Sequence, residues 1–293
     1  MSAHVTTSYS YSDAASRDDL LAQVALALSA QGDRVLICDW DVVSPGLPSL
    51  GALESEPGPG AGIMEWVRDW ALKRHMAEPD EAVLADLTAR VTGLAGDTTL
   101  YLLPAHGPRT DPARVSAETP WHRFLIEQPL AGQSMIRAAI DGLGRKGNFD
   151  HVLLRCPCGF TDLGALLLVL IPHTLVLMGR YVRHDMFGLS RIFHATQSAV
   201  DGRLEGREYP LRRVLVAGPV PDHLEALRAQ RRLDWDGLFT GGVCEARIEI
   251  PPEPVRLLDG SMEYGVAAIR VASQIARRLG SVVSNSGWRS SWV

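Results

Sequence analysis

The sequence predicts an α/β fold: a three-layer sandwich around a doubly wound, mainly parallel sheet of seven or eight strands. Short apolar runs alternate with helical patterns along the chain, which is typical of strands joined by helical crossovers. These runs lack the apolar–polar alternation of a half-exposed strand, as expected for strands covered on both faces. With 46% hydrophobic and 22% charged residues, the composition suits a large globular core. We expect a single domain over residues 1–280.

Seven apolar runs predict the strands, and eight helical patterns accompany them. The expected strands are Val5–Tyr11, Arg34–Trp40, Thr98–Leu103, His151–Arg155, Thr174–Met178, Arg213–Ala217 and Ala246–Ile250. The expected helices are Arg17–Gln31, Gly62–Met76, Glu81–Val91, Met135–Leu143, Asp162–Leu170, Asp185–Leu204, Asp222–Arg232 and Ser261–Leu279. Residues 56–60, with alternating Pro and Gly, and residues 104–120 are expected to be irregular. Residues 281–293 are expected to form a flexible tail. Its Trp288 and Trp292 either dock on a partner or fold back on the body.

Charge and composition narrow the classes of function. The net charge of −5 provides no overall basic field, so neither nucleic acid nor an anionic membrane is an expected partner. The arginine-rich segments 228–232 and 270–278 are interpreted as solvated faces, because acidic residues accompany the first of them. The longest apolar stretch, residues 163–178, is interrupted by Pro172 and His173 and is too short to cross a bilayer. The polar first twenty residues lack a secretion signal, and the four cysteines show no regular spacing, so we expect a cytoplasmic protein.

Four short motifs lie at the ends of predicted strands. They are Tyr9-Ser10-Tyr11, Asp39-Trp40-Asp41 with Pro45-Gly46, Leu103-Pro104-Ala105-His106-Gly107, and FDHVLLRCPCGFTD at residues 149–162. In order and spacing they resemble the MinD/ParA-like (SIMIBI class) P-loop ATPases, and most closely the subgroup whose phosphate loop reads KGGVGR. The resemblance covers about residues 5–200. It implies a nucleotide-switch scaffold, a dimer with the phosphate loops face to face, and a protein partner.

The first motif is followed by residues that depart from the family's phosphate-binding loop, the Walker A loop. In the family, glycines let the backbone amides approach the phosphates closely. At the KGGVG positions this chain has Ser12, Asp13, Ala14, Ala15 and Ser16. Arg17 keeps the basic residue that ends the motif, but Asp18 replaces the Ser or Thr that binds Mg²⁺. The chain's two lysines, Lys73 and Lys146, are remote in sequence. We expect a degenerate loop and a helix that begins at Arg17, with Asp18 and Asp19 at its anion-favouring amino terminus.

Two replacements of opposite charge predict a salt bridge. In working relatives, the resemblance implies, a Ser or Thr and the Walker B aspartate meet around one Mg²⁺. This chain has Asp18 at the first of these positions and Arg155 at the second. We therefore expect an Asp18–Arg155 pair that fills the space of the metal and phosphates, with Asp39 or Asp41 as a second acceptor. The alternative is that both side chains are exposed and unrelated.

Asp39 and Asp41 leave two interpretations open. By resemblance they lie near the Mg²⁺ and the attacking water, so they are either a retained metal-binding or catalytic pair, or a polar strand end kept for the fold. The vestigial switch segments of the family are matched by Pro45-Gly46 and by Thr161-Asp162. We expect Thr161 and Asp162 to cap the helix that follows them.

Cysteine and histidine patterns provide little support for a metal site. Cys38, Cys156 and Cys158 are the candidate thiolate ligands for Zn²⁺ or an iron–sulfur cluster, but no fourth ligand is evident. Free cysteines are common in cores, so we expect no metal. The histidines show no HxxxH or HExxH spacing and GxSxG is absent, which argues against a hydrolase.

These observations favour a pseudo-ATPase as the first hypothesis: a MinD/ParA-like scaffold, implied by the resemblance, that no longer hydrolyses ATP. Such a protein regulates or scaffolds through protein contacts, needs no cofactor, and dimerises without nucleotide with Arg17 and Asp18 near the interface. The alternative is an unconventional ATPase switch that binds ATP and Mg²⁺ through Arg17 and Asp39 or Asp41. A thiol-ligated metal protein is the third hypothesis.

Overall fold

The architecture was obtained as a computed structural model of the chain. It describes residues 3–12, 14–56, 60–72, 86–92, 94, 99–204, 209–218, 225–250, 256–258, 261–263 and 266–285.

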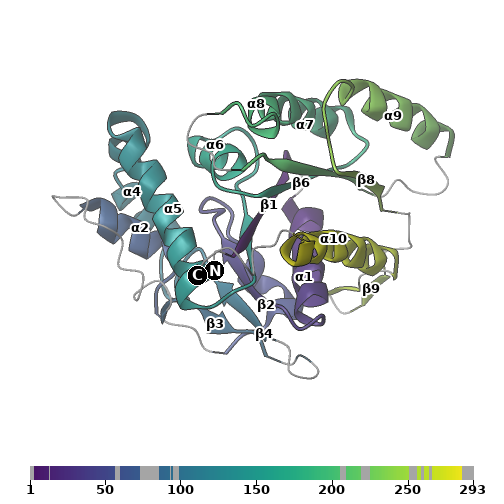
Figure 1. Cartoon of the computed structure of the whole chain (residues 1–293). Coiled ribbons are helices and arrows are strands. Elements are labelled where there is room, and N and C mark those ends of the chain that lie inside the picture. The colour runs from purple at the N-terminus through teal and green to yellow at the C-terminus, as the bar shows by residue number, and fades with distance from the viewer. Residues whose placement is uncertain are drawn as a thin grey trace.

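A single eight-stranded sheet forms the centre of the molecule (Figure 1). Its strand order is β3-β4-β2-β5-β1-β6-β7-β8, and every pair is parallel except β3 with β4. The strands are β1 (His4–Ser10), β2 (Arg34–Asp39), β3 (Ala89–Arg90), β4 (Thr99–Leu103), β5 (His151–Arg155), β6 (Thr174–Gly179), β7 (Arg212–Ala217) and β8 (Ala246–Glu249). This confirms the predicted α/β fold with its mainly parallel sheet.

Helices cover both faces of the sheet, as a doubly wound fold requires. One face packs on α1 (Ala14–Ser29) and α10 (Val266–Asn285), which also pack on each other. The helices that contribute to the core of the other face are α2 (Ile63–Leu72), α4 (Pro112–Glu118), α5 (Pro129–Lys146), α6 (Asp162–Val169), α7 (Arg183–Ala195), α8 (Gln197–Val200) and α9 (Glu225–Leu238). Figure 1 shows α6, α7, α8 and α9 gathered over one end of the sheet.

Strand periodicity explains why two cores form. Successive side chains of a strand point to opposite faces of the sheet. On β2, Val35 and Ile37 join the core under α1 and α10, whereas Leu36 and Cys38 join the core on the opposite face. Both sets are fully buried, which accounts for the continuous apolar run in the sequence.

The strand register places the functional edge. Arg155, the last residue of β5, lies opposite Asp39 of β2 on one side and Ser8 of β1 on the other. Because these three strands are parallel and adjacent, their carboxyl ends open at the same edge of the sheet. Ligands of open α/β sheets bind outside this edge.

Several predicted boundaries are wrong. The helix expected over residues 81–91 does not continue to its end, because Ala89–Arg90 pair with β4 as strand β3; residues 81–85 lie outside the described part of the chain. Within the stretch 104–120, expected to be irregular, α4 forms behind Asp111, whose side chain accepts hydrogen bonds from Ala113 N and Arg114 N. Asp followed by Pro is a helix-start signal that the prediction missed.

The carboxyl-terminal region also differs from the prediction. A short hairpin of β9 (Arg256–Leu258) and β10 (Ser261–Glu263) precedes α10, which begins at Val266 and not at Ser261. The helix continues to Asn285, so the first residues of the predicted tail, 281–285, are helical. Trp288 and Trp292 lie outside the described residues.

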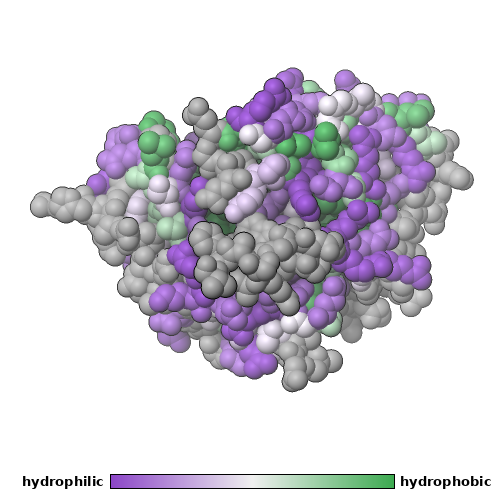
Figure 2. Space-filling model, viewed as in Figure 1, coloured by the Kyte–Doolittle hydropathy of each residue, from purple (hydrophilic) through white to green (hydrophobic). Residues whose placement is uncertain are grey.

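The remaining regular elements are short. They are two 3₁₀ turns, η1 (Leu47–Ser49) and η2 (Gly51–Leu53), and a π-helical turn, η3 (Arg123–Glu127). Among the described residues, no helix combines the length and apolar character needed to cross a membrane. Of the residues that the space-filling view colours, most are hydrophilic, and the hydrophobic ones lie in small groups among them (Figure 2).

Candidate functional site

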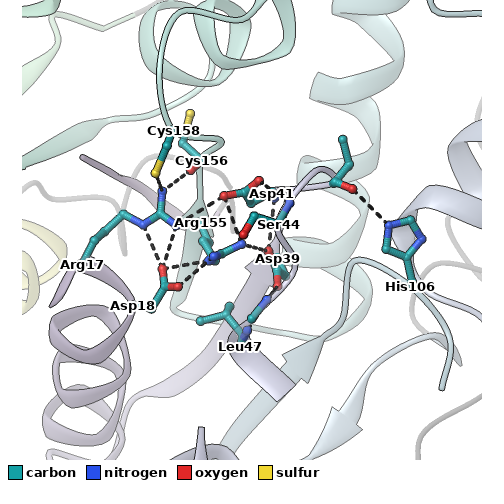
Figure 3. A network of polar contacts seen from close by, with 12 residues as sticks. Arg17, Asp18, Asp39, Asp41, Ser44, Leu47, His106, Arg155, Cys156 and Cys158 are labelled. Carbon is teal, nitrogen blue, oxygen red and sulfur yellow. Dashed lines mark hydrogen bonds and ion pairs between the residues drawn. The ribbon is translucent and has the colours of Figure 1, made fainter. Parts of the chain in front are cut away.

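Five charged side chains meet at the carboxyl edge of the sheet, where β1, β2 and β5 end beside the start of α1 (Figure 3). They are Arg17 and Asp18 of α1, Asp39 and Asp41 at and after the end of β2, and Arg155 at the end of β5. All five are buried, and none is more than 5% exposed. A charged cluster this dry is stable only when its members pair with one another.

The centre of the cluster is a two-pronged contact between Arg155 and Asp18. Arg155 Nε donates to Asp18 Oδ1 and Arg155 Nη2 donates to Asp18 Oδ2, each at 2.7 Å. This parallel geometry matches the planar guanidinium to the carboxylate and is the strongest form of such a pair. The two residues that the sequence analysis expected to pair are therefore in direct contact, and both are buried.

Asp39 accepts a hydrogen bond from Arg155 and also accepts hydrogen bonds from the loop that follows β2. Its Oδ1 accepts from Arg155 Nη1 at 2.9 Å and from the backbone N–H of Asp41 at 3.1 Å. Its Oδ2 accepts from the backbone N–H groups of Gly46 at 3.1 Å and Leu47 at 3.3 Å. Burial raises the pKa of the Asp39 carboxyl, although the charge and hydrogen bond of Arg155 and the two backbone donors act to lower it.

Arg17 links the cluster to the loop after β5. It contacts Asp18 Oδ1 at 2.8 Å through both Nε and Nη2, and its Nη2 lies 3.5 Å from Asp41 Oδ2. Its Nη1 donates to the carbonyl of Cys156 and lies 3.3 Å from Cys158 Sγ. Arg17 has no exposed surface, so its donors face inward to these partners.

The cluster carries more negative than positive charge. Two guanidiniums face three carboxylates, since Asp41 Oδ2 also lies 3.3 Å from Arg155 Nη1. Burial alone would lower the pKa of Arg155, but the hydrogen bond to Asp18 and the charges of Asp39, Asp18 and Asp41 outweigh it and raise the pKa. Arg155 therefore stays charged, and by formal charge the cluster has an anionic excess.

Helix α1 begins earlier than predicted. It starts at Ala14, not at Arg17, so Ala14, Ala15 and Ser16 form its first turn together with Arg17. The first turn contains no acidic residue, which corrects the expectation that Asp18 and Asp19 occupy the helix amino terminus. Alanine has the highest helix propensity, which accounts for helix where the sequence analysis expected a degenerate loop. Ser12 precedes the helix, and Asp13 lies outside the described residues.

The chain resembles known proteins in its fold and not in its sequence. No protein-family model matches it, and no curated protein matches it in sequence. Solved structures match over nearly the whole chain. MinD of Aquifex aeolicus has a TM-score of 0.59 at 16% identity, covering 95% of this chain and 97% of its own. An ATP complex of a McdA variant from Cyanothece has a TM-score of 0.65 at 16% identity, covering 95% and 96%.

A third match is an enzyme. Cobyrinic acid a,c-diamide synthase of Mycobacterium smegmatis, solved with ADP and magnesium, has a TM-score of 0.61 at 17% identity and covers 99% of this chain and 96% of its own. The chain has the MinD-type P-loop ATPase fold. At these identities the likeness establishes the fold alone.

Of the two segments that the resemblance matched to the family's switches, the first contacts the cluster. Gly46 packs against the Arg155–Asp18 contact: a Cβ on Gly46 would lie 3.3 Å from Arg155 Nη2 and 3.4 Å from Asp18 Oδ2. Pro45 is exposed. In the second segment Thr161 is the N-cap of α6, and its hydroxyl accepts from Gly164 N at 2.9 Å, while Asp162 occupies the first turn.

The three candidate thiol ligands are not arranged as a metal site. Cys38 and Cys156 are fully buried, and burial raises the pKa of each thiol above its ordinary value. Cys158 is partly exposed and lies beside Arg17. Within the described part of the chain, no three His, Cys, Asp or Glu side chains are placed to hold a metal ion.

One residue that supports the site had no signal in the sequence. Asp185, in the first turn of α7, accepts hydrogen bonds from Ser12 Oγ and from the backbone N–H and Nε of Arg180. It therefore fixes the segment before α1 to α7 across the sheet edge. Ser12 and Asp185 are 173 positions apart, and neither belongs to a motif that would have linked them.

Proposed function

We propose that this chain is a pseudo-ATPase: a MinD-type scaffold that does not hydrolyse ATP and acts as a regulator or scaffold through protein contacts. The observation that carries the proposal is the Arg155–Asp18 contact, which occupies the carboxyl edge of the sheet with the chain's own charges. In this fold that edge is where a ligand would bind.

The cluster does not suit ATP and Mg²⁺. A triphosphate entering between Arg155 and Asp18 would separate two buried, mutually paired charges, and breaking such a pair typically costs about 3–5 kcal/mol. Arg155 stands at the end of β5, where a carboxylate would be needed for a metal, and it repels a divalent cation. We therefore assign no reaction step to a nucleotide or a metal at this site.

The local charge points in the same direction. Three carboxylates against two guanidiniums leave an anionic excess, and the chain as a whole has a net charge of −5. A triphosphate would have to approach against this field without a lysine to compensate, because Lys73 and Lys146 belong to other parts of the chain. Binding of an anion is disfavoured before any contact is broken.

The alternative, an ATPase switch built on Arg17 and Asp39 or Asp41, gains no support from the geometry. Arg17 is fully buried and its three nitrogens already contact Asp18, Asp41, Cys156 and Cys158. Asp39 accepts four hydrogen bonds, three of them from the backbone. We therefore interpret both residues as structural members of the buried charged cluster.

A protein partner is part of the proposal. A MinC:MinD complex from Aquifex aeolicus is among the matching structures, at a TM-score of 0.58 and 18% identity, so this fold supports partner binding in at least that protein. We propose a protein partner and a nucleotide-independent homodimer, in a cytoplasmic setting that keeps the four cysteines reduced. The expectation that Arg17 and Asp18 lie near the interface of this dimer stays a prediction; both side chains are buried within the chain.

A thermal-shift titration with ATP·Mg²⁺, run beside a phosphate-release assay, tests the proposal. A ligand at one hundred times its Kd stabilises a protein by about 2.7 kcal/mol, so binding would raise Tm measurably. We expect no rise in Tm and no phosphate release at millimolar ATP. McdA from Cyanothece, measured in parallel, is the positive control for nucleotide binding. A saturable rise in Tm for this chain would discard the proposal.

A further inference from the structure

The exposed side of α7 has an unusual composition. Arg183, Phe187 and Arg191 recur at every fourth position, with His184 beside them, and all four are exposed. Residues at this spacing line one stripe of a helix. Asp185, the acidic residue of α7, is turned inward and is 1% exposed, where it accepts from Ser12 and Arg180. The exposed stripe of α7 is therefore basic and aromatic without an acid to balance it.

Aromatic contacts join this stripe to Tyr11, which follows β1, and to Phe160, in the loop after β5. The ring of Tyr11 lies 4.9 Å from the ring of His184 and 5.2 Å from that of Phe160, measured between centroids. Tyr11 packs directly over Gly188, where a Cβ would come within 2.1 Å of the ring. Phe160 and Phe187 are 60% and 52% exposed. We call Arg183, His184, Phe187 and Arg191, together with Tyr11 and Phe160, the α7 face.

The arginines of the α7 face are available to a partner. Within the described residues, neither Arg183 nor Arg191 forms an ion pair, and the guanidinium of Arg191 lies 5.0 Å from the centre of the Phe187 ring. Near α9 the situation is different, because Arg232 pairs with Glu249 and Arg247 pairs with Asp236. The basic charge of α7 is thus uncompensated on a chain whose net charge is −5.

We propose that the α7 face docks an acidic protein segment that carries a hydrophobic anchor. Phe160 and Phe187 offer a partly exposed aromatic platform, and aromatic residues and arginine are enriched among the residues that dominate binding energy. Arg183 and Arg191 complement acidic side chains beside the anchor. A protein segment is favoured over nucleic acid because the net negative charge of the chain opposes a polyanion. The inference rests on the proposed function, since it identifies the surface through which the scaffold acts.

The probe for a direct test is a fluorescein-labelled helical peptide with glutamates and, at helical spacing, one Leu and one Phe. Its fluorescence anisotropy is followed as the full chain is added, at low and at high salt. We expect saturable binding that weakens with salt. Replacing the glutamates of the peptide by glutamine, or its Leu and Phe by alanine, is expected to weaken binding by about tenfold or more.

Surface variants assign the peptide to the α7 face. The double variant Arg183→Glu/Arg191→Glu and the single variant Phe187→Ala are each expected to weaken binding by about tenfold. Arg270→Glu/Arg277→Glu, on the exposed side of α10, changes the net charge equally and is expected to bind as the wild type does. Absence of peptide binding, or equal loss in the α7 and α10 variants, would overturn the proposal.

Two further measurements separate the other occupants and the parent hypothesis. Tighter binding of a labelled DNA duplex than of the peptide, lost in the α7 double variant, would assign the face to nucleic acid and overturn the proposal. Self-association of the chain in sedimentation equilibrium, lost in the same variant, would assign the face to a second copy and overturn the proposal. Binding of ATP to the chain would contradict the pseudo-ATPase proposal and would not change the peptide measurement. Absence of peptide binding would overturn the docking proposal and would not change the ATP measurement.

Discussion

Arg155 and Asp18, 137 positions apart in the chain, face each other through two parallel hydrogen bonds of 2.7 Å at the carboxyl edge of the sheet. Strand β5 supplies the guanidinium and helix α1 supplies the carboxylate. The contact joins the two elements that border the site, so it stabilises the fold and closes the site at once.

Removing one partner of this contact is expected to be costly. Arg155→Met leaves Asp18, Asp39 and Asp41 buried without their principal counter-ion, and we expect a loss of about 3–5 kcal/mol in the free energy of unfolding. Urea denaturation measures it. The control is Arg114→Met, because Arg114 and its partner Glu118 are exposed and such a pair contributes about 1 kcal/mol or less. A loss for Arg155→Met no larger than that of the control would contradict the closed-site interpretation.

Gly46 provides a steric test of the same contact. In Gly46→Ala the new methyl group would press on Arg155 Nη2 and Asp18 Oδ2, and we expect a destabilisation of about 1–3 kcal/mol. Gly51→Ala is the matched control, because nothing lies within 4 Å of a Cβ at that position. The control is expected to be neutral or stabilising by about 0.4–1 kcal/mol. Equal Tm values for the two variants would show that the Arg155–Asp18 contact accommodates the methyl group without loss of stability.

The amino-terminal edge of the sheet makes stability depend on pH. Burial of His4 lowers its pKa well below 6.5, and the nearby His173, His151 and Arg212 lower it further. The unfolded chain therefore binds more protons than the folded chain just below that pH. The contribution of His4 to the free energy of unfolding is fully present above pH 6.5. It is lost as the pH falls from there toward the lowered pKa, by at most about 1.4 kcal/mol per pH unit for one group.

His4→Gln isolates this contribution. The variant removes the titrating ring while keeping a side chain able to hydrogen-bond Thr174, the partner of His4 Nε2. We expect a shallower decline of the unfolding free energy between pH 6.5 and pH 5 than in the wild type. Parallel curves for the two proteins would assign the acid sensitivity to other groups.

The start of α6 is expected to depend on the hydroxyl of Thr161. Thr161→Ala removes the acceptor for Gly164 N and is expected to lower stability by about 1 kcal/mol. Thr161→Ser keeps an oxygen in the same place and is expected to retain most of it. Comparable losses in both variants, measured by thermal unfolding, would mean that the methyl group and not the cap is responsible.

The sequence is sufficient for the sheet and for much of the site. Continuous apolar runs mark strands that are buried on both faces, and each of the seven expected strands is present within about two residues of its predicted ends. Asp39 and Arg155 each end such a run, and parallel strands bring their carboxyl ends to one edge. Asp18 and Arg155 carry opposite charges, so a pairing between them could be predicted once both were placed at this edge.

Other features depend on contacts that a local pattern does not encode. Strand β3 contains two residues and exists because it pairs with β4, while its flanks read as helix. The first turn of α1 contains helix-forming alanines, and the helix begins at Ala14 where the sequence analysis expected a loop. The Ser12–Asp185 link spans the sheet edge and needs the assembled fold to bring its partners together.

A crystal structure grown with ATP and Mg²⁺ is the most direct test of the closed site. The decisive region is the space between α1, the end of β2 and the end of β5. We predict that Arg155 stays paired with Asp18 and that no electron density for a nucleotide lies there. Density for ATP or ADP held by the backbone amides at the start of α1, with the Arg155 side chain displaced from Asp18, would contradict it.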